Sequence, residues 1–271
     1  MTTPVFGICS WTLGIDDLEK LMSTTASMGL NAIQYCEGAD THPADKILAS
    51  AESHNLTIVA NDPFDCAPGE KHGDATLENA VAFYKKEIDL AARLGCLQTL
   101  QGLSAWTRDC KDDDTAWQFI VDAVQQLSGY AKEKDVPLTY EPCNFYEVAY
   151  VHTADEYQRL IQDSGCDNIS VLLDSFHMNI GEKRPLTTLR QYGSRNSVFH
   201  ISGSNREGIA QSNIDFKAYK EALNDSGFDG PCVFEFVLST TGVNEPPRNK
   251  EEMRMMKNMV IESMELWKSY G

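Results

Sequence analysis

Short runs of apolar and β-branched residues alternate along this chain with longer stretches in which apolar residues recur every three or four positions. The short runs are typical of buried β-strands, and the longer stretches are typical of amphipathic helices. The predicted strands span residues 5–11, 31–36, 56–62, 96–102, 137–144, 169–176, 197–205 and 232–237. The predicted helices span residues 16–29, 44–55, 76–95, 113–135, 153–165, 185–193, 215–227 and 251–269. The pattern therefore predicts eight consecutive strand–helix pairs.

The residues at the ends of the predicted helices support these boundaries. Several helices end at a glycine of the C-cap type, namely Gly29, Gly95, Gly165 and Gly227, and several begin at Asp or Thr. Eight βα units without a Pro- or Ser-rich linker are best satisfied by one (β/α)8 TIM barrel that covers residues 1–271 as a single domain. A doubly wound open sheet is the alternative. Its usual Gly-rich phosphate loop is missing after the first strand, where residues 9–17 hold one glycine.

Composition narrows the class of protein. Hydrophobic residues make up 42% of the chain and charged residues 23%, and no apolar run is long enough for a membrane span. The N-terminus lacks the pattern of an export signal, and the eight cysteines form no CxxC pair, so we expect a cytoplasmic protein with reduced thiols. The net charge of −17 argues against nucleic acid as a partner, because such binding needs Lys and Arg to neutralise phosphates.

Four metal-binding side chains stand at the C-terminal ends of the last four apolar runs of the barrel: Glu141, Asp174, His200 and Glu235. The C-terminal ends of barrel strands surround one mouth, so these residues are predicted to converge although they are far apart in sequence. A helix cap or a surface charge explains a single acid, but an unpaired buried carboxylate costs several kcal/mol. Three carboxylates and one imidazole suit a single divalent ion, for which we expect Mn²⁺, with Mg²⁺ and Co²⁺ as alternatives.

Three further polar residues follow these ligands at short spacing: Glu147 six residues after Glu141, His177 three after Asp174, and Arg206 six after His200. A lone histidine near a strand end is more often structural, but the aspartate beside this one favours a functional role. Two tryptophans, Trp11 and Trp106, follow the first and fourth predicted strands. Their aromatic rings suit either the apolar walls of a pocket or ordinary packing at the barrel rim.

The segments YEPCNFYE, LLDSFHMNI, FHISGSNR and FEF in the second half of the chain resemble the ketose 3-epimerases, the D-tagatose and D-psicose epimerase group of the xylose isomerase-like superfamily. The resemblance implies that one divalent metal is bound by Glu141, Asp174, His200 and Glu235. It implies that a ketose is held near O1 and O2 by Glu147, His177 and Arg206. It also implies a homo-oligomer, either a dimer or a tetramer.

The chemistry of such a site follows from its groups. Removal of the C3 proton of a 2-ketose gives an enediolate that a divalent metal stabilises. One of the two glutamates, Glu141 or Glu235, is predicted to take that proton, and the other is predicted to return one to the opposite face. The centre is thereby inverted. His177 and Arg206 are predicted to orient the O1 and O2 end and to stabilise the developing oxyanion.

The chain departs from the epimerase pattern in two places, and both concern the substrate. After Arg206 the family usually shows a Gly-x-Gly segment leading to a Pro-Trp or Asp-Trp pair, whereas this chain has EGIAQSNIDF. The segment NDPFDCAPGEKHGD after the third predicted strand matches no motif. We therefore expect a different substrate lid and leave the identity of the sugar open.

Several alternatives use a similar site. A lyase that removes an aglycone from 3-keto-glycosides, of the C-glycoside deglycosidase type, is the leading one, and such enzymes in some cases act with a small accessory subunit. Inosose isomerases and dehydratases are further candidates. The endonuclease of the superfamily needs additional histidines and a basic face that this sequence lacks. A non-catalytic sugar-binding protein would bind ligand without exchanging its protons with solvent.

Overall fold

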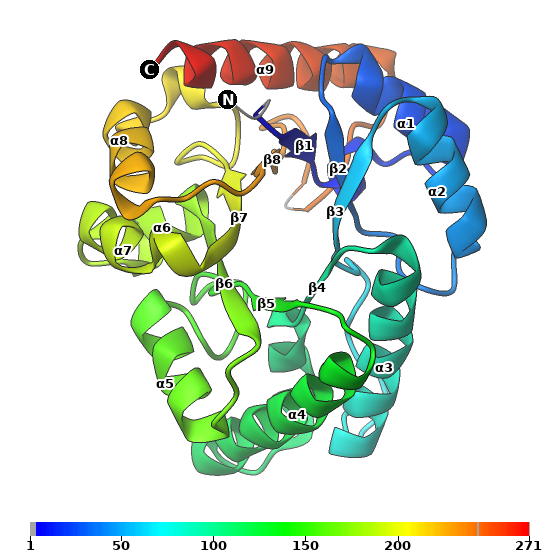
Figure 1. Cartoon of the computed structure of the whole chain (residues 1–271), viewed down its shortest axis with the longest axis vertical. Coiled ribbons are helices and arrows are strands. Elements are labelled where there is room, and N and C mark those ends of the chain that lie inside the picture. Colours follow the sequence, from blue (N-terminus) through cyan, green and yellow to red (C-terminus); the bar gives the residue numbers. More distant parts are fainter. Residues whose placement is uncertain (1–3, 243, 271) are drawn as a thin grey trace.

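Within residues 4–242 and 244–270, which a computed structural model describes, eight parallel strands surround the centre of the molecule and the helices lie outside them (Figure 1). The strands are β1 (Phe6–Ile8), β2 (Ala32–Tyr35), β3 (Thr57–Asn61), β4 (Leu97–Thr99), β5 (Leu138–Tyr140), β6 (Ile169–Asp174), β7 (Asn196–Ile201) and β8 (Cys232–Phe234). They form one sheet in the order β1-β8-β7-β6-β5-β4-β3-β2. A parallel bridge between Cys9 and Gln34 joins the end of β1 to β2, so the sheet is a nearly closed barrel. The (β/α)8 prediction is confirmed.

The α-helices follow the strands in the predicted order. They are α1 (Leu18–Ser27), α2 (Ala44–Ser53), α3 (Leu77–Leu94), α4 (Asp113–Glu133), α5 (Ala154–Ser164), α6 (Ser175–Gly181), α7 (Pro185–Tyr192), α8 (Phe216–Ser226) and α9 (Lys250–Ser269). Gly95, Gly165 and Gly227 are left-handed C-caps, as predicted. Gly29 is also left-handed but stands one residue beyond the C-cap Met28. No helix in the described part of the chain is long and apolar enough to cross a membrane.

Of the short elements that were not predicted, two lie on the side of the barrel that carries the candidate residues and bear on the site. A 3₁₀-helix, η2 (Gln101–Asp109), follows β4, and α6 begins directly after β6. The predicted strand 169–176 therefore ends at Asp174, because the Asp174 carboxylate accepts a hydrogen bond from the backbone N–H of Phe176 and caps α6. The last residue of the strand is thus held in place by the helix that follows it.

The core has two layers. A small cluster of Cys9, Cys36, Leu172, Val198 and Val233 is separate from the main core and draws on five different segments of the barrel wall, as expected for the packed interior of a TIM barrel. The much larger cluster includes the apolar faces of the helices. The eight cysteines are all free, and Cys9, Cys36, Cys96, Cys143 and Cys232 are buried.

Candidate metal centre and substrate cavity

The four predicted ligands converge at the C-terminal ends of β5 to β8. Glu141 follows β5 directly, Asp174 ends β6, His200 is the penultimate residue of β7, and Glu235 follows β8 directly. All four side chains are buried, and one ligand atom from each lies within 4.8 Å of those of the others. The topology brings them together, as the sequence predicted.

Buried atoms without partners test whether a cation fits this cluster. Among the described residues, Glu141 Oε1, His200 Nδ1 and Glu235 Oε2 are buried and accept or donate no hydrogen bond. His200 Nδ1 lies 3.2 Å from Glu141 Oε1 and 3.0 Å from Glu235 Oε2. Glu235 Oε2 is ion-paired with Arg206 at 2.9 Å but accepts no hydrogen bond. Leaving buried groups without hydrogen bonds costs free energy, and a divalent cation bound by all three atoms removes that cost. The donor set therefore fits one oxygen-preferring divalent ion.

His200 is oriented by a residue that the sequence analysis did not single out. The Nε2–H of His200 donates to Oε1 of Gln34 on β2 at 3.0 Å, which leaves Nδ1 directed at the carboxylates. A hydrogen bond of this kind to the second ring nitrogen fixes the tautomer of a ligating histidine. Gln34 thus holds the imidazole in the orientation that metal binding needs.

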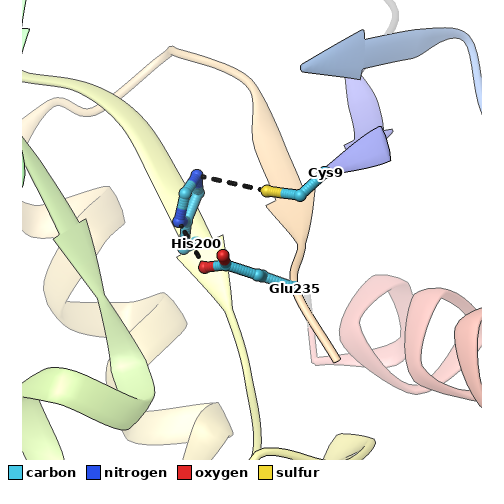
Figure 2. Close-up of side chains that lie close together, drawn as sticks. All are labelled: Cys9, His200 and Glu235. Carbon is cyan, nitrogen blue, oxygen red and sulfur yellow. Dashed lines mark hydrogen bonds and ion pairs between the residues drawn. The ribbon is translucent and has the colours of Figure 1, made fainter. Parts of the chain in front are cut away.

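A cysteine also lies beside this histidine. Figure 2 shows the imidazole of His200 between Glu235 and Cys9, with one ring nitrogen directed at the Glu235 carboxylate and the other at the Cys9 thiol. Cys9 Sγ lies 3.8 Å from His200 Nε2. Burial raises the pKa of this thiol well above its usual value. Cys9 Sγ lies close enough to His200 and Glu235 to share a metal ion with them, but the raised pKa disfavours the thiolate that metal binding needs.

The pKa values of the three carboxyl groups in the cluster are strongly shifted from their usual values. Burial raises the pKa of Glu141 to about 8 although His200 acts in the opposite direction, and burial raises the pKa of Asp174 to about 6 against the effect of Arg206. Burial also acts to raise the pKa of Glu235, but Arg206 and His200 hold it well below its usual range. A bound cation favours the ionised form of every one of these carboxyl groups.

Arg206 contacts two of the candidate ligands. Its Nη1 donates to Asp174 Oδ2, its Nη2 lies 2.9 Å from Glu235 Oε2, and its guanidinium lies over the ring of Phe176 at 4.8 Å. Its backbone φ is 66°, in the left-handed region that non-glycine residues rarely adopt. Strain of this kind is common where a side chain must be aimed at a functional site.

His177 is fixed in one tautomer by Asn144, a second residue that the sequence analysis did not single out. His177 Nδ1 accepts hydrogen bonds from the backbone N–H of Asn144 at 3.3 Å and from its side-chain Nδ2 at 2.8 Å. The ring proton therefore lies on Nε2, 3.8 Å from Glu141 Oε1. Burial and Arg206 hold the pKa of His177 well below its usual value, so the ring is a neutral donor. Asn144 also donates to Glu147 Oε1 at 2.9 Å.

A cavity of about 530 Å³ opens beside the cluster. Of the four candidate ligands, Glu141 and Glu235 line it, whereas Asp174 and His200 are not among its lining residues. The other polar residues that line it include Asp62, Gln101, Glu147, His177 and Arg206. The two glutamates that were predicted to move protons are thus the two ligands that face the space where a substrate can lie.

The two predicted wall tryptophans have different surroundings. Trp11 lines the cavity, stacks on Phe64 with a centroid distance of 4.6 Å, and donates its indole N–H to Glu235 Oε1 at 2.9 Å. Trp106 is buried and is not among the lining residues. Its indole N–H donates to the carbonyl oxygen of Cys66, which does line the cavity, so Trp106 supports the wall from behind.

We expect Trp11→Phe to lower kcat about tenfold, because Glu235 loses the hydrogen bond that orients its carboxylate while an aromatic wall remains. Steady-state kinetics with metal-saturated protein measures the effect. Trp117→Phe is the matched control, since that indole N–H donates to Asp163 on the helical surface and is remote from the cavity. Equal rates for Trp11→Phe and the wild type would show that the contact has no catalytic role.

Asp62 is the third residue that the sequence analysis missed. It follows β3, lines the cavity and is 6% exposed. The rule that found Glu141, an acid at the end of an apolar strand, applies equally to Asp62. Gln34 and Asn144 gave weaker signals, as single polar residues within a strand and within the YEPCNFYE segment.

Comparison with known proteins agrees with this geometry. The family model of the xylose isomerase-like TIM barrel matches residues 22–259. L-ribulose 3-epimerase of Mesorhizobium japonicum is 29% identical over 232 residues, which cover 81% of this chain and 75% of that protein. D-psicose 3-epimerase of Agrobacterium fabrum is 28% identical over 227 residues, covering 80% and 78% respectively. A solved structure of L-ribulose 3-epimerase superposes with a TM-score of 0.82 at 21% identity, covering 99% of this chain and 96% of that one.

Proposed function

The chain belongs to the xylose isomerase-like TIM barrel family, and on this premise we propose that it is a divalent-metal-dependent epimerase that inverts C3 of a free ketose. One observation carries the proposal. Within the buried cluster, the two ligands that face the cavity are both glutamates, Glu141 and Glu235. Two carboxylates beside one substrate are what inversion by proton removal and return requires. The named 3-epimerases among the relatives support the same reaction class.

Neutral and positive donors line the cavity beside the glutamates. Within the described residues, the Nε2–H of His177 has no acceptor at hydrogen-bond distance and is directed at the cluster, and Arg206 brings a guanidinium to the same place. We assign both to the O1 and O2 end of the sugar, where they stabilise negative charge that develops on oxygen. Glu147, held by Asn144, accepts a hydrogen bond from a hydroxyl at that end.

The proton transfers belong to the two glutamates. A divalent cation held by Glu141, Asp174, His200 and Glu235 supplies Lewis-acid polarisation of the sugar carbonyl. One glutamate takes the C3 proton, and the electron pair of the C–H bond moves to the C2 carbonyl to give the enediolate of the sugar. The other glutamate gives a proton to the opposite face of C3, and the carbonyl re-forms. Trp11 orients the carboxylate of Glu235 through its hydrogen bond. Together with Phe64, on which it stacks, it limits the water that reaches C3.

Product analysis on a panel of sugars tests the proposal. The Mn²⁺-loaded protein is incubated with D-fructose, D-psicose, D-tagatose, L-ribulose and a 3-keto-glucoside, and the products are separated by chromatography. The proposal predicts the C3 epimer of at least one ketose. Release of the aglycone from the 3-keto-glucoside, with no epimer from any ketose, would replace it by the lyase.

One observation favours the lyase as the second candidate. The aromatic side chains of Phe145 and Tyr146 are 54% and 79% exposed and pack on each other, and they directly precede Glu147, which lines the cavity. An exposed apolar group at this place suits the small accessory subunit of such a lyase, whereas a self-contained epimerase requires a second copy of this chain to cover it. Light scattering of the purified protein, with the wild type compared with Tyr146→Ser, reports whether a second copy covers these rings.

A further inference from the structure

Asp62 is a buried carboxylate in the main cavity that the proposed reaction does not use. Its Oδ1 accepts hydrogen bonds from Thr99 Oγ1 and from Gln101 Nε2, the latter at 2.6 Å, and its Oδ2 accepts one from Gln34 Nε2 at 2.7 Å. A carboxylate offers about four acceptor positions, so one position on Oδ2 remains. Since Asp62 lines the cavity, a ligand hydroxyl can reach the side chain.

Gln34 connects this carboxylate to the metal cluster. The same amide that donates to Asp62 accepts the Nε2–H of His200. Asp62 has two conceivable roles. In the first it holds Gln34 and, through Gln34, the imidazole of His200. In the second it contacts the substrate itself, and the placement of Asp62 in the barrel favours this second role.

Asp62 lies across the mouth of the barrel from the residues assigned to the O1 and O2 end of the sugar. It follows β3, whereas His177 and Arg206 follow β6 and β7, and Figure 1 shows β3 and β7 on opposite sides of the barrel. One cavity is lined by residues of both groups. A sugar held at O1 and O2 by the β6 and β7 side thus directs its far end at Asp62.

Gln101, which donates to Asp62, also lines the cavity and is a neutral polar group. The chain neighbours of Asp62 in the cavity, Pro63 and Phe64, are apolar. The nearby cation Arg108 already donates to the carbonyl oxygens of Gly69 and Lys71 and is paired with its neighbour Asp109. A phosphate or carboxylate at the far end of the substrate would therefore be repelled by Asp62, and Arg108 is already paired and does not offset this repulsion. A neutral hydroxyl suits the site.

We propose that Asp62 determines substrate specificity by accepting a hydrogen bond from a hydroxyl at the C4–C6 end of an uncharged ketose. The proposal rests on the proposed function, because it takes the orientation of the sugar from it. A site built around a charged acceptor rejects an analogue that lacks the matching hydroxyl, since the carboxylate then loses water without gaining a partner. Wild-type protein is expected to prefer the complete sugar over one of its deoxy analogues by about tenfold to hundredfold in kcat/KM.

The test takes the ketose of the panel above that the wild type converts best and compares it with its 4-, 5- and 6-deoxy analogues in four proteins loaded with Mn²⁺. Asp62→Asn removes the charge but also places an NH₂ group against the NH₂ of Gln34 or, with the amide turned, against that of Gln101. The double variant Gln34→Glu/Asp62→Asn restores the hydrogen-bond chain to His200 and keeps the total charge, but moves the carboxylate away from the cavity. Asp65→Asn, an exposed neighbour outside the cavity lining, is the control.

The double variant decides between the two roles. If Asp62 contacts the sugar, the double variant loses the preference for the complete sugar, mostly through KM and the dissociation constant measured by calorimetry, while Asp65→Asn keeps it. If the double variant retains the wild-type preference, Asp62 only positions Gln34 and the proposal is wrong. Failure of the proposed function gives a different result, because the wild type then turns over no ketose at all.

Discussion

We expect Glu141→Gln to lower kcat for the proposed C3 epimerisation by about 10³-fold or more, and Glu235→Gln to do the same. An amide keeps an oxygen for the cation but neither takes nor gives a proton at C3. Both glutamates line the cavity, and the proposed mechanism assigns them to opposite faces of the sugar, so neither is expected to substitute for the other. Initial rates with metal-saturated protein measure the loss, and metal content by mass spectrometry shows whether the ion is retained. Glu262→Gln, an exposed residue of α9, is the control.

The same two variants make a sharper prediction. With one carboxylate intact, each variant still exchanges the C3 proton of one epimer with solvent, and the two variants differ in which epimer exchanges. Inversion is lost in both, because no group returns a proton to the second face. Full epimerisation by either variant, at a rate within tenfold of the wild type, would remove that glutamate from the mechanism.

Removal of the divalent ion has the second largest expected effect. We expect chelation to abolish epimerisation and added Mn²⁺ to restore it, because nothing else at the cluster stabilises charge on the sugar carbonyl to the same degree. An ion present at 100 times its Kd stabilises the fold by about 2.7 kcal/mol, so calorimetry should show a higher Tm with Mn²⁺ than with chelator. Asp174→Asn is expected to lose most of this increase, whereas the exposed Asp45→Asn keeps it.

Metal affinity should also depend on pH. Burial acts to lower the pKa of His200, but Glu141 and Glu235 hold it well above its usual value, and the ring must lose its Nδ1 proton to bind a cation. Affinity therefore falls as pH is lowered. Calorimetric titrations with Mn²⁺, Mg²⁺ and Co²⁺ at two pH values measure this trend and rank the ions. If protein from which a chelator has removed all metal remained fully active, this would contradict the assignment of the cluster as the site of an ion that the reaction needs.

The sequence predicted the barrel and the cluster for one physical reason. Apolar strands of similar length alternate with amphipathic helices, and parallel strands in a closed sheet bring their C-terminal ends to one mouth. An acid or imidazole at the end of such a strand is then placed by topology alone. The positions of the four candidate ligands could be predicted from this topology alone, since each stands at the end of its own strand: Glu141, Asp174, His200 and Glu235.

The supporting residues could not be predicted in this way. The pairing of β2 with β3 shifts between Ile33 and Gln34, and the strict alternation of inward and outward side chains is lost there. Asn61 hydrogen-bonds Glu87 on α3, whereas Asp62 faces the cavity. Asn144 orients His177 through a turn that no periodic pattern encodes. The left-handed backbone of Arg206 is likewise a property of the folded loop.

The measurement that tests the central claim most directly is deuterium incorporation at C3 during turnover in D₂O, followed by NMR. The Mn²⁺-loaded protein is incubated with the ketose that it converts, and the label is located in substrate and product. Because two glutamates exchange their protons with solvent, the account predicts that the epimer formed carries deuterium at C3 and nowhere else. An epimer without label at C3, or label at C1 or C4, would contradict proton transfer at C3 by Glu141 and Glu235.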